Sequence, residues 1–199
     1  MKALIFGANG QDGFYLAEQC RHRGIEPIGI SRSGEWLRGD VADYGCVCAL
    51  VENYEPSYIF HLAANSTTRH EALFDNHAAI ATGTLNLLEA VHKSALKTRV
   101  FISGSGLQFQ NTGASINEET PFDARSPYAV ARIQSVYAAR YYRRLGVQAY
   151  VGYLFHHDSP RRGPHHVSQT IARAAARIRN GSNEVVEVGD MSVEKEFTF

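Results

Sequence analysis

Cysteine is scarce in this chain, and charge of neither sign dominates it. Only Cys20, Cys46 and Cys48 occur among 199 residues, and an odd, sparse set gives no disulfide framework. Lys plus Arg and Asp plus Glu number 20 each, which argues against a nucleic-acid-binding protein with its basic excess. No apolar run reaches membrane-spanning length, and the N-terminus reads as a strand instead of a secretion signal. We therefore expect a soluble cytoplasmic protein with no membrane or nucleic-acid partner.

Metal ligands in a common spacing are also missing. Cys46 and Cys48 are separated by a single residue, fewer than zinc sites use. Histidines gather at 156, 157, 165 and 166, but no carboxylate-rich segment accompanies them. The sequence therefore predicts no metal site.

Short apolar runs alternate with segments of helical periodicity along most of the chain. Strands are expected at 1–6, 27–30, 58–63, 99–103, 148–155 and 184–188, and helices at 11–23, 43–53, 78–94, 127–145 and 167–179. This alternation predicts an α/β fold: a Rossmann-type, doubly wound parallel sheet with helices on both faces. Residues 1–155 would form an NAD(P)-binding domain. Residues 156–199 would begin a small C-terminal substrate lobe in a truncated chain, because no helix follows the last expected strand.

A glycine-rich loop joins the first expected strand to the first helix. Gly7 permits a tight turn, Gly10 lets a pyrophosphate approach the backbone, and Gly13 lets the helix lie close to the strand. The amide groups of a helix N-terminus favour phosphate binding. The residues expected to contact a dinucleotide here are Gly7, Asn9, Gly10, Gln11, Asp12 and Gly13.

The residue after the second strand bears on the choice of coenzyme. NAD sites usually place an acidic residue there to bind the adenosine ribose, but this chain has Arg32 between two serines. A guanidinium suits a 2′-phosphate, so we expect NADP, with NAD as the alternative. Arg32 could also be an ordinary solvated charge. Asp40 and Val41 are candidates for contact with the adenine, although the same segment also offers Asp43 as a helix N-cap.

A second group of chemically capable residues lies later in the chain. Tyr128 and Arg132 are four residues apart at the start of an expected helix and share a face. A tyrosine one turn from a cation can act as a base near neutral pH. Ser105 follows the fourth strand, where its hydroxyl could meet the same substrate oxygen.

Four stretches of the chain resemble the extended short-chain dehydrogenases, in particular the nucleotide-sugar epimerase/dehydratase group and, within it, the GDP-mannose 4,6-dehydratases. These stretches are Gly10–Gly13 with Tyr15–Glu18, Gly83–Ala90, Ser126–Ala131 and Phe155–Gly163. The last, which contains Ser-Pro-Arg-Arg-Gly after a strand, is the most specific of them.

The resemblance implies roles for individual residues. Tyr128 would be the catalytic acid or base, Ser105 would hydrogen-bond the reacting oxygen, and Arg132 stands where the family has a coenzyme-binding lysine. The coenzyme set would extend to Leu62, Ala63 and Ala64. Substrate contacts would come from Ser66, Ser105, His156, Arg161 and Arg162. The substrate would be a nucleotide sugar with hydride transfer at C4, and the protein a homodimer.

Three positions depart from the family pattern. Arg132 replaces lysine, Leu107 stands where the dehydratases have a glutamate, and His156 replaces an asparagine. Leucine cannot move the proton needed to expel a C6 hydroxyl, so the sequence favours a 4-ketosugar reductase or a 4-epimerase over a dehydratase. The alternative function is a catalytically impaired protein that only binds the coenzyme or the nucleotide sugar.

Overall fold

The structure is a computed structural model that describes residues 1–65, 67–164, 166–190 and 192. The chain divides into two compact units, Met1–Leu154 and Phe155–Phe199. Each unit is described by itself below.

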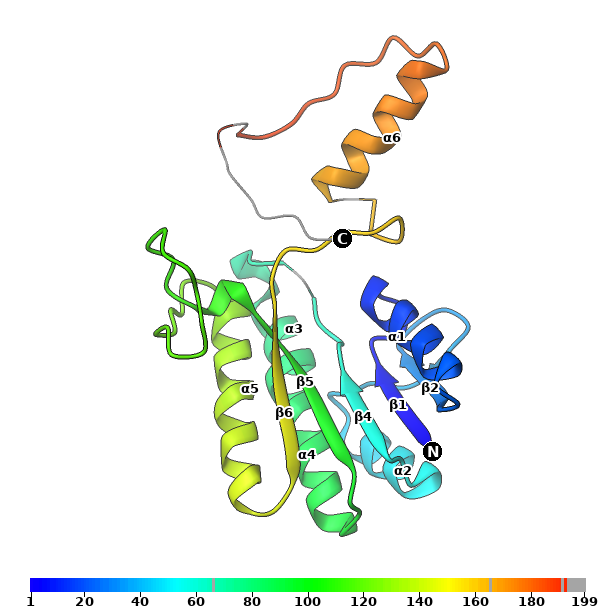
Figure 1. Cartoon of the computed structure of the whole chain (residues 1–199), viewed down its shortest axis with the longest axis vertical. Helices are drawn as coiled ribbons and strands as arrows, with labels where there is room; N and C mark the ends of the chain where they lie inside the picture. The colour runs from blue at the N-terminus through cyan, green and yellow to red at the C-terminus, as the bar shows by residue number, and fades with distance from the viewer. Residues whose placement is uncertain (66, 165, 191, 193–199) are drawn as a thin grey trace. The chain divides into compact units, whose positions relative to one another are not determined.

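The first unit is built around a six-stranded parallel sheet with the strand order β3-β2-β1-β4-β5-β6 (Figure 1). The strands are β1 (Lys2–Phe6), β2 (Glu26–Ser31), β3 (Leu37–Arg38), β4 (Tyr58–His61), β5 (Arg99–Ser105) and β6 (Gln148–Leu154). The order reverses between β1 and β4, and in such sheets ligands bind outside the carboxyl ends of the strands at that point.

Helices cover both faces of the sheet, as expected. The helices of this unit are α1 (Gln11–His22), α2 (Tyr44–Tyr54), α3 (Leu73–Asn76), α4 (Gly83–Ser94) and α5 (Pro127–Arg144). Two 3-10 turns, η1 (His70–Ala72) and η3 (Gly106–Gln108), and a π-helical segment, η2 (His77–Thr82), join them.

Side-chain alternation along β1 explains why the first unit has a hydrophobic cluster on each face of the sheet. Leu4 and Phe6 belong to a large core cluster that includes residues of α2, α4 and α5. Ala3 and Ile5, one residue out of phase, pack with Ala17 of α1 in a second cluster. Because successive side chains of a strand point to opposite faces, one apolar strand supplies both cores.

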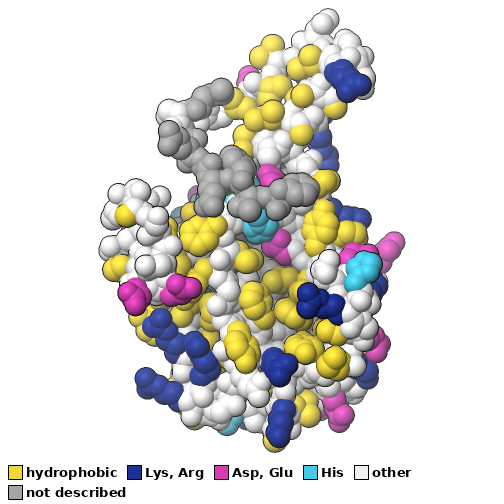
Figure 2. Space-filling model, in the orientation of Figure 1, with side chains coloured by type: hydrophobic (Ala, Val, Ile, Leu, Met, Phe, Trp, Pro, Cys, Tyr) yellow, Lys and Arg dark blue, Asp and Glu magenta, His cyan; other side chains and the backbone are white. Residues whose placement is uncertain are grey.

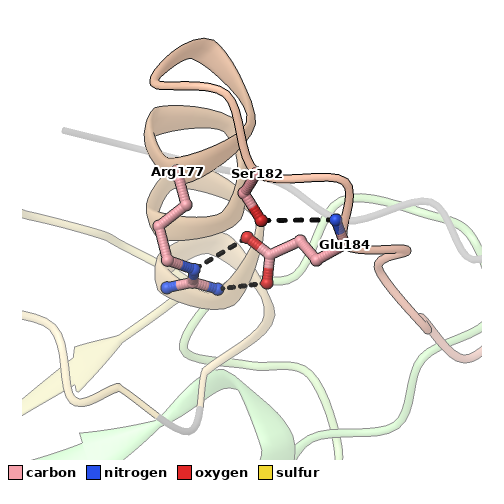
Figure 3. Close-up of polar contacts among 3 residues, drawn as sticks. All are labelled: Arg177, Ser182 and Glu184. Carbon is pink, nitrogen blue, oxygen red and sulfur yellow. Dashed lines mark hydrogen bonds and ion pairs between the residues drawn. The ribbon is translucent and has the colours of Figure 1, made fainter.

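The second unit contains α6 (Val167–Arg179), whose bounds match the sequence prediction. The segment after α6 folds back on it through Glu184 (Figure 3). The Arg177 guanidinium donates to both carboxylate oxygens of Glu184, at 2.7 and 3.0 Å, and the Glu184 amide donates to Ser182 Oγ at 3.3 Å. This ion pair lowers the pKa of Glu184, chiefly through the hydrogen bond.

The expected strand at 184–188 is wrong. These residues form no strand, and Glu184 is bound to α6 instead. The three valines of this segment favour an extended backbone, but a strand exists only where a neighbour completes its hydrogen bonds. Three smaller differences are the unexpected β3, the extension of β5 to Ser105 and the π-helical start of the helix expected at 78–94.

Across the described ranges, no helix is long and apolar enough to cross a membrane.

Candidate coenzyme and active site

The loop after β1 is packed too tightly for any residue but glycine at two positions. Gly7 has φ +92°, and a Cβ on it would lie 2.7 Å from the Ala63 amide nitrogen. A Cβ on Gly13 would lie 2.5 Å from the Gly7 carbonyl oxygen. Both distances are shorter than real Cβ contacts, so the expectation that Gly13 brings the helix close to the strand is confirmed.

Gly10 lies at the N-terminus of α1. It is the N-cap residue, without a side chain to cap the helix, and its amide donates to the Gly7 carbonyl at 3.0 Å. A Cβ on Gly10 would meet only the Gly7 oxygen, at 3.3 Å. The start of α1, with Gln11 and Asp12 in its first turn, therefore presents backbone and the positive end of the helix dipole at the carboxyl end of β1.

Asn9 connects this loop to the loop after β2. Its amide donates to Ser31 Oγ at 2.9 Å and to the Ser33 carbonyl oxygen. The Arg32 side chain is exposed, and its carbonyl accepts a hydrogen bond of 3.0 Å from the Arg38 guanidinium. The Arg38 guanidinium is thus held against the backbone of Arg32, in the loop that Asn9 connects to the phosphate loop. Arg38 was not predicted from the sequence. It is placed there by the short strand β3, which is too short to give a periodic pattern.

For the segment after β3, the sequence offered two interpretations: adenine contacts from Asp40 and Val41, or a helix N-cap at Asp43. Asp43 is the N-cap of α2, with its carboxylate accepting from the Cys46 amide at 3.1 Å. Asp40 accepts from the Ala42 amide at 2.9 Å. Val41 is only 4 % exposed and belongs to the main core, so it offers little surface to an adenine ring.

The loop after β4 joins the glycine loop to the helix that carries Tyr128. The Leu62 amide donates to the Phe6 carbonyl at 2.9 Å, and Ala63 lies against Gly7. Ala64 and Tyr128 pack against one buried cluster formed by Ile80, Ala81 and Ala131. The candidate coenzyme and catalytic residues are thereby brought to one end of the sheet. Ser66 lies outside the described residues.

Ser105 and Tyr128 occupy the ends of two adjacent elements. Ser105 ends β5, and its Oγ accepts from the Leu107 amide at 3.2 Å, which leaves its own proton for another acceptor. Tyr128 is half-buried in the first turn of α5, which packs against β5 and η3. That helix starts here because Ser126 Oγ caps the Ala129 amide at 3.1 Å and Pro127 follows. Leu107 is 48 % exposed.

Arg132 is buried, with 4 % of its surface exposed. Its Nη1 donates to the carbonyl oxygen of Ser103 and, at 2.8 Å, to Ser103 Oγ. Its guanidinium carbon lies 5.0 Å from the centroid of the Tyr128 ring. Ser103, which the sequence reading did not select, also donates from Oγ to the His61 carbonyl at 2.9 Å.

His61 lies fully buried beneath this group, with Nε2 at 3.4 Å from the Ile80 carbonyl oxygen. Burial lowers its pKa to about 4, and the charge of Arg132 contributes in the same direction. His61 is therefore neutral at physiological pH, which avoids two adjacent buried cations.

The remaining candidates belong to the second unit. His156 and Arg161 are exposed and Arg162 is half-buried. The Arg162 amide donates to the Ser159 carbonyl at 3.0 Å, and Gln169 of α6 donates to the same oxygen at 3.2 Å, so the arginine turn is attached to the helix. A hydrogen bond from Ser168 is the main cause that lowers the pKa of Asp158. His165 is outside the described residues, and among those described no three potential ligands could hold a metal ion.

The chain is a member of the extended short-chain dehydrogenases of the nucleotide-sugar epimerase/dehydratase group. The chain is similar to the solved structure of MoeE5 in complex with UDP-glucose and NAD, with a TM-score of 0.84, 23 % identity and coverage of 100 % of this chain and 67 % of that one. It is also similar to a Thermotoga maritima UDP-glucose 4-epimerase with UDP-glucose, with a TM-score of 0.83, 20 % identity and coverage of 99 % and 69 %. These likenesses confirm the predicted fold class.

The sequence comparison is more specific. A family model described as GDP-mannose 4,6 dehydratase matches residues 4–199. GDP-mannose 4,6 dehydratase 2 of Caenorhabditis elegans is 33 % identical over 225 residues, covering 98 % of this chain and 59 % of that protein. The chain belongs to the GDP-mannose 4,6 dehydratase family, which confirms the resemblance seen in the sequence. It spans 59 % and 64 % of the first two curated relatives.

Proposed function

We propose that this protein is an NAD(P)-dependent enzyme that transfers hydride at C4 of a nucleotide-linked hexose. The observation that carries the proposal is the packing of the glycine loop on the β4 loop, which in turn shares a buried cluster with Tyr128. This packing holds a dinucleotide-binding backbone and a tyrosine at the same end of one sheet. Ligands of open α/β sheets bind at that end.

NADP is the proposed coenzyme. Its pyrophosphate would lie on the backbone at the start of α1, where Gly10 has no side chain to stand in the way. Arg32 and Arg38 would bind the 2′-phosphate, since guanidinium groups pair well with phosphate oxygens. NAD is the alternative, and it is the coenzyme in the MoeE5 complex.

Tyr128 and Ser105 would act on the sugar. The coenzyme, when bound, supplies or accepts the hydride. Tyr128 would hold or move the proton at the sugar O4, with Ser105 donating a hydrogen bond to the same oxygen. Leu107 has no group that moves a proton, so a 4-ketosugar reductase or 4-epimerase fits this site better than a dehydratase.

The second unit would begin the substrate lobe, with His156, Arg161 and Arg162 contacting the nucleotide sugar. We also propose a homodimer that pairs α4 and α5 of two copies. Leu85 is 47 % exposed on α4, and Tyr137 and Tyr141 are each 58 % exposed on α5. Exposed large apolar side chains on neighbouring helices are typical of such an interface.

The test is turnover of NADPH with a panel of nucleotide 4-ketosugars, followed by the absorbance of the reduced coenzyme. We expect oxidation of NADPH by the wild-type protein and none by Tyr128→Phe, with coenzyme binding unchanged in that variant. Full activity of Tyr128→Phe would contradict the role given to the tyrosine.

The second candidate function is binding without catalysis. The burial of Arg132 against Ser103 and the exposed apolar Leu107 favour it, because each stands where the family pattern has a different type of residue. A protein that binds NADPH and nucleotide sugars but turns over none of the panel would support this alternative.

A further inference from the structure

Arg132 carries a buried charge, and no carboxylate of the described residues pairs with it. Within the part of the chain that the structure describes, Arg132 forms no ion pair, and its Nε has no hydrogen-bond partner. Burying a charge without a counter-ion is strongly unfavourable. The contacts to Ser103 and to the ring of Tyr128 must therefore compensate, which indicates that these three residues form one structural group.

The geometry explains why an arginine occupies this position. One edge of the guanidinium donates to two oxygens of Ser103, while its carbon lies 5.0 Å from the centroid of the Tyr128 ring. A planar, delocalised cation can make both contacts, whereas a lysine ammonium is a point charge that cannot span them. The Ser103 hydroxyl accepts from Arg132 and donates to the His61 carbonyl, so the connection continues from α5 through β5 to β4.

We propose that Ser103 and Arg132 are positioning residues that brace Tyr128 against the end of β5, and that Arg132 acts through Tyr128 without binding the coenzyme. The second part rests on the proposed function. With 4 % of its surface exposed and Nη1 bound to Ser103, Arg132 has little surface left to hydrogen-bond a ribose. Replacement of lysine by arginine thus converts a coenzyme-binding position into an internal support.

The first test follows the Tyr128 ring in protein labelled with ring-13C tyrosine. Its NMR signal is the one that Tyr128→Phe lacks. We expect Ser103→Ala to shift and broaden this signal, because Arg132 loses a hydrogen-bond partner, and Ser103→Thr to leave it in place because the hydroxyl is retained. Arg140→Met is the matched control. Arg140 also lies over aromatic rings of the same helix region, Phe122 and Tyr137, but makes no contact with Ser103.

The second test is the affinity for NADPH. A lost charge-assisted contact to the coenzyme would weaken binding about tenfold or more. We therefore expect the NADPH affinity of Arg132→Met to fall by much less than that factor. The same variant should displace the Tyr128 signal. Arg132→Lys is the second variant if Arg132→Met melts early by circular dichroism, and the same displacement is expected.

Two results would overturn the proposal. One is a Tyr128 signal that Ser103→Ala leaves unchanged. The other is a tenfold loss of NADPH affinity in Arg132→Met with the Tyr128 signal in its wild-type place. If the wild-type protein binds no NADPH, the proposed function fails, and the ring signals alone still decide whether Ser103 and Arg132 position Tyr128.

Discussion

The candidate site is built from backbone contacts at the carboxyl end of β1 and from side-chain contacts at the carboxyl end of β5. At β1 the geometry comes from the backbone: Gly7 and Gly13 let main-chain atoms approach one another more closely than a Cβ allows. At β5 it comes from side chains: Arg132, Ser103 and His61 form a buried polar group with few alternatives for hydrogen bonding.

The two regions should therefore respond differently to substitution. A backbone-built region is sensitive to any added atom, because its main-chain atoms already lie in close contact. A side-chain-built region depends on protonation and on the completeness of its hydrogen bonds. Figure 2 shows Lys and Arg side chains, with Asp and Glu side chains among them, on the visible surface of the first unit.

Gly7→Ala should give the largest effect. Its Cβ would meet backbone atoms at 2.7 Å in a left-handed conformation, so we expect a loss of about 3–5 kcal/mol of unfolding free energy from clash and strain together. Gly146→Ala is the matched control, with the same φ of +92° and no atom within 4 Å of the added Cβ, and should lose only about 1–2 kcal/mol. Equal losses in urea unfolding would refute the packing argument.

The second prediction concerns pH at the β5 end. The folded-state pKa of His61 is about 4 and its unfolded value 6.5, so the unfolded chain binds the proton first as pH falls. Stability from this group is fully present above pH 6.5 and is lost as pH falls toward 4, by up to about 3 kcal/mol.

Urea unfolding of the wild type and of His61→Gln at a series of pH values measures this loss as a difference. We expect the pH slope of the wild type between 6.5 and 4 to exceed that of the variant, because the other titrating groups are common to both. Parallel slopes would mean that His61 does not titrate as its burial requires.

The third prediction separates the arginines beside the phosphate loop from the loop itself. Arg32→Ala should weaken NADPH binding about tenfold and leave NADH binding almost unchanged, because only NADPH carries the 2′-phosphate. Arg38→Ala should act in the same direction. A similar loss for both coenzymes, measured by calorimetry, would show that Arg32 supports the loop structure instead of reading the phosphate.

The smallest effects should come from the helix caps. Asp43→Ala removes the cap of α2, and Ser126→Ala removes the cap of α5 next to Tyr128. Each should lower the unfolding free energy by about 1 kcal/mol. Asp43→Asn and Ser126→Thr keep a capping oxygen and should restore most of the loss; if they do not, the side-chain hydrogen bonds are not the cause.

The sequence predicted the backbone-built region well and the side-chain-built region poorly. The spacing of Gly7, Gly10 and Gly13 implies its own geometry, because local backbone limits depend on near neighbours. The bounds of α6 and the cap at Asp43 were also accessible from local patterns. These features depend on interactions that span only a few residues.

The contact between Arg132 and Ser103 joins residues 29 positions apart, and His61 meets Ile80 across 19. No periodicity records such pairings, because they follow from how β4, β5 and α5 pack. The wrong strand at 184–188 fails for the same reason: the local preference for an extended backbone was present, but no strand of the described residues pairs with this segment.

The decisive measurement for the proposed coenzyme site is the binding of NADPH and NADH to the folded protein. Titration calorimetry with NADPH and with NADH should show one site per chain, tighter for NADPH, and no binding by a Gly10→Val variant that melts like the wild type. A well-folded wild-type protein that shows no binding heat with either coenzyme would contradict the proposed coenzyme site.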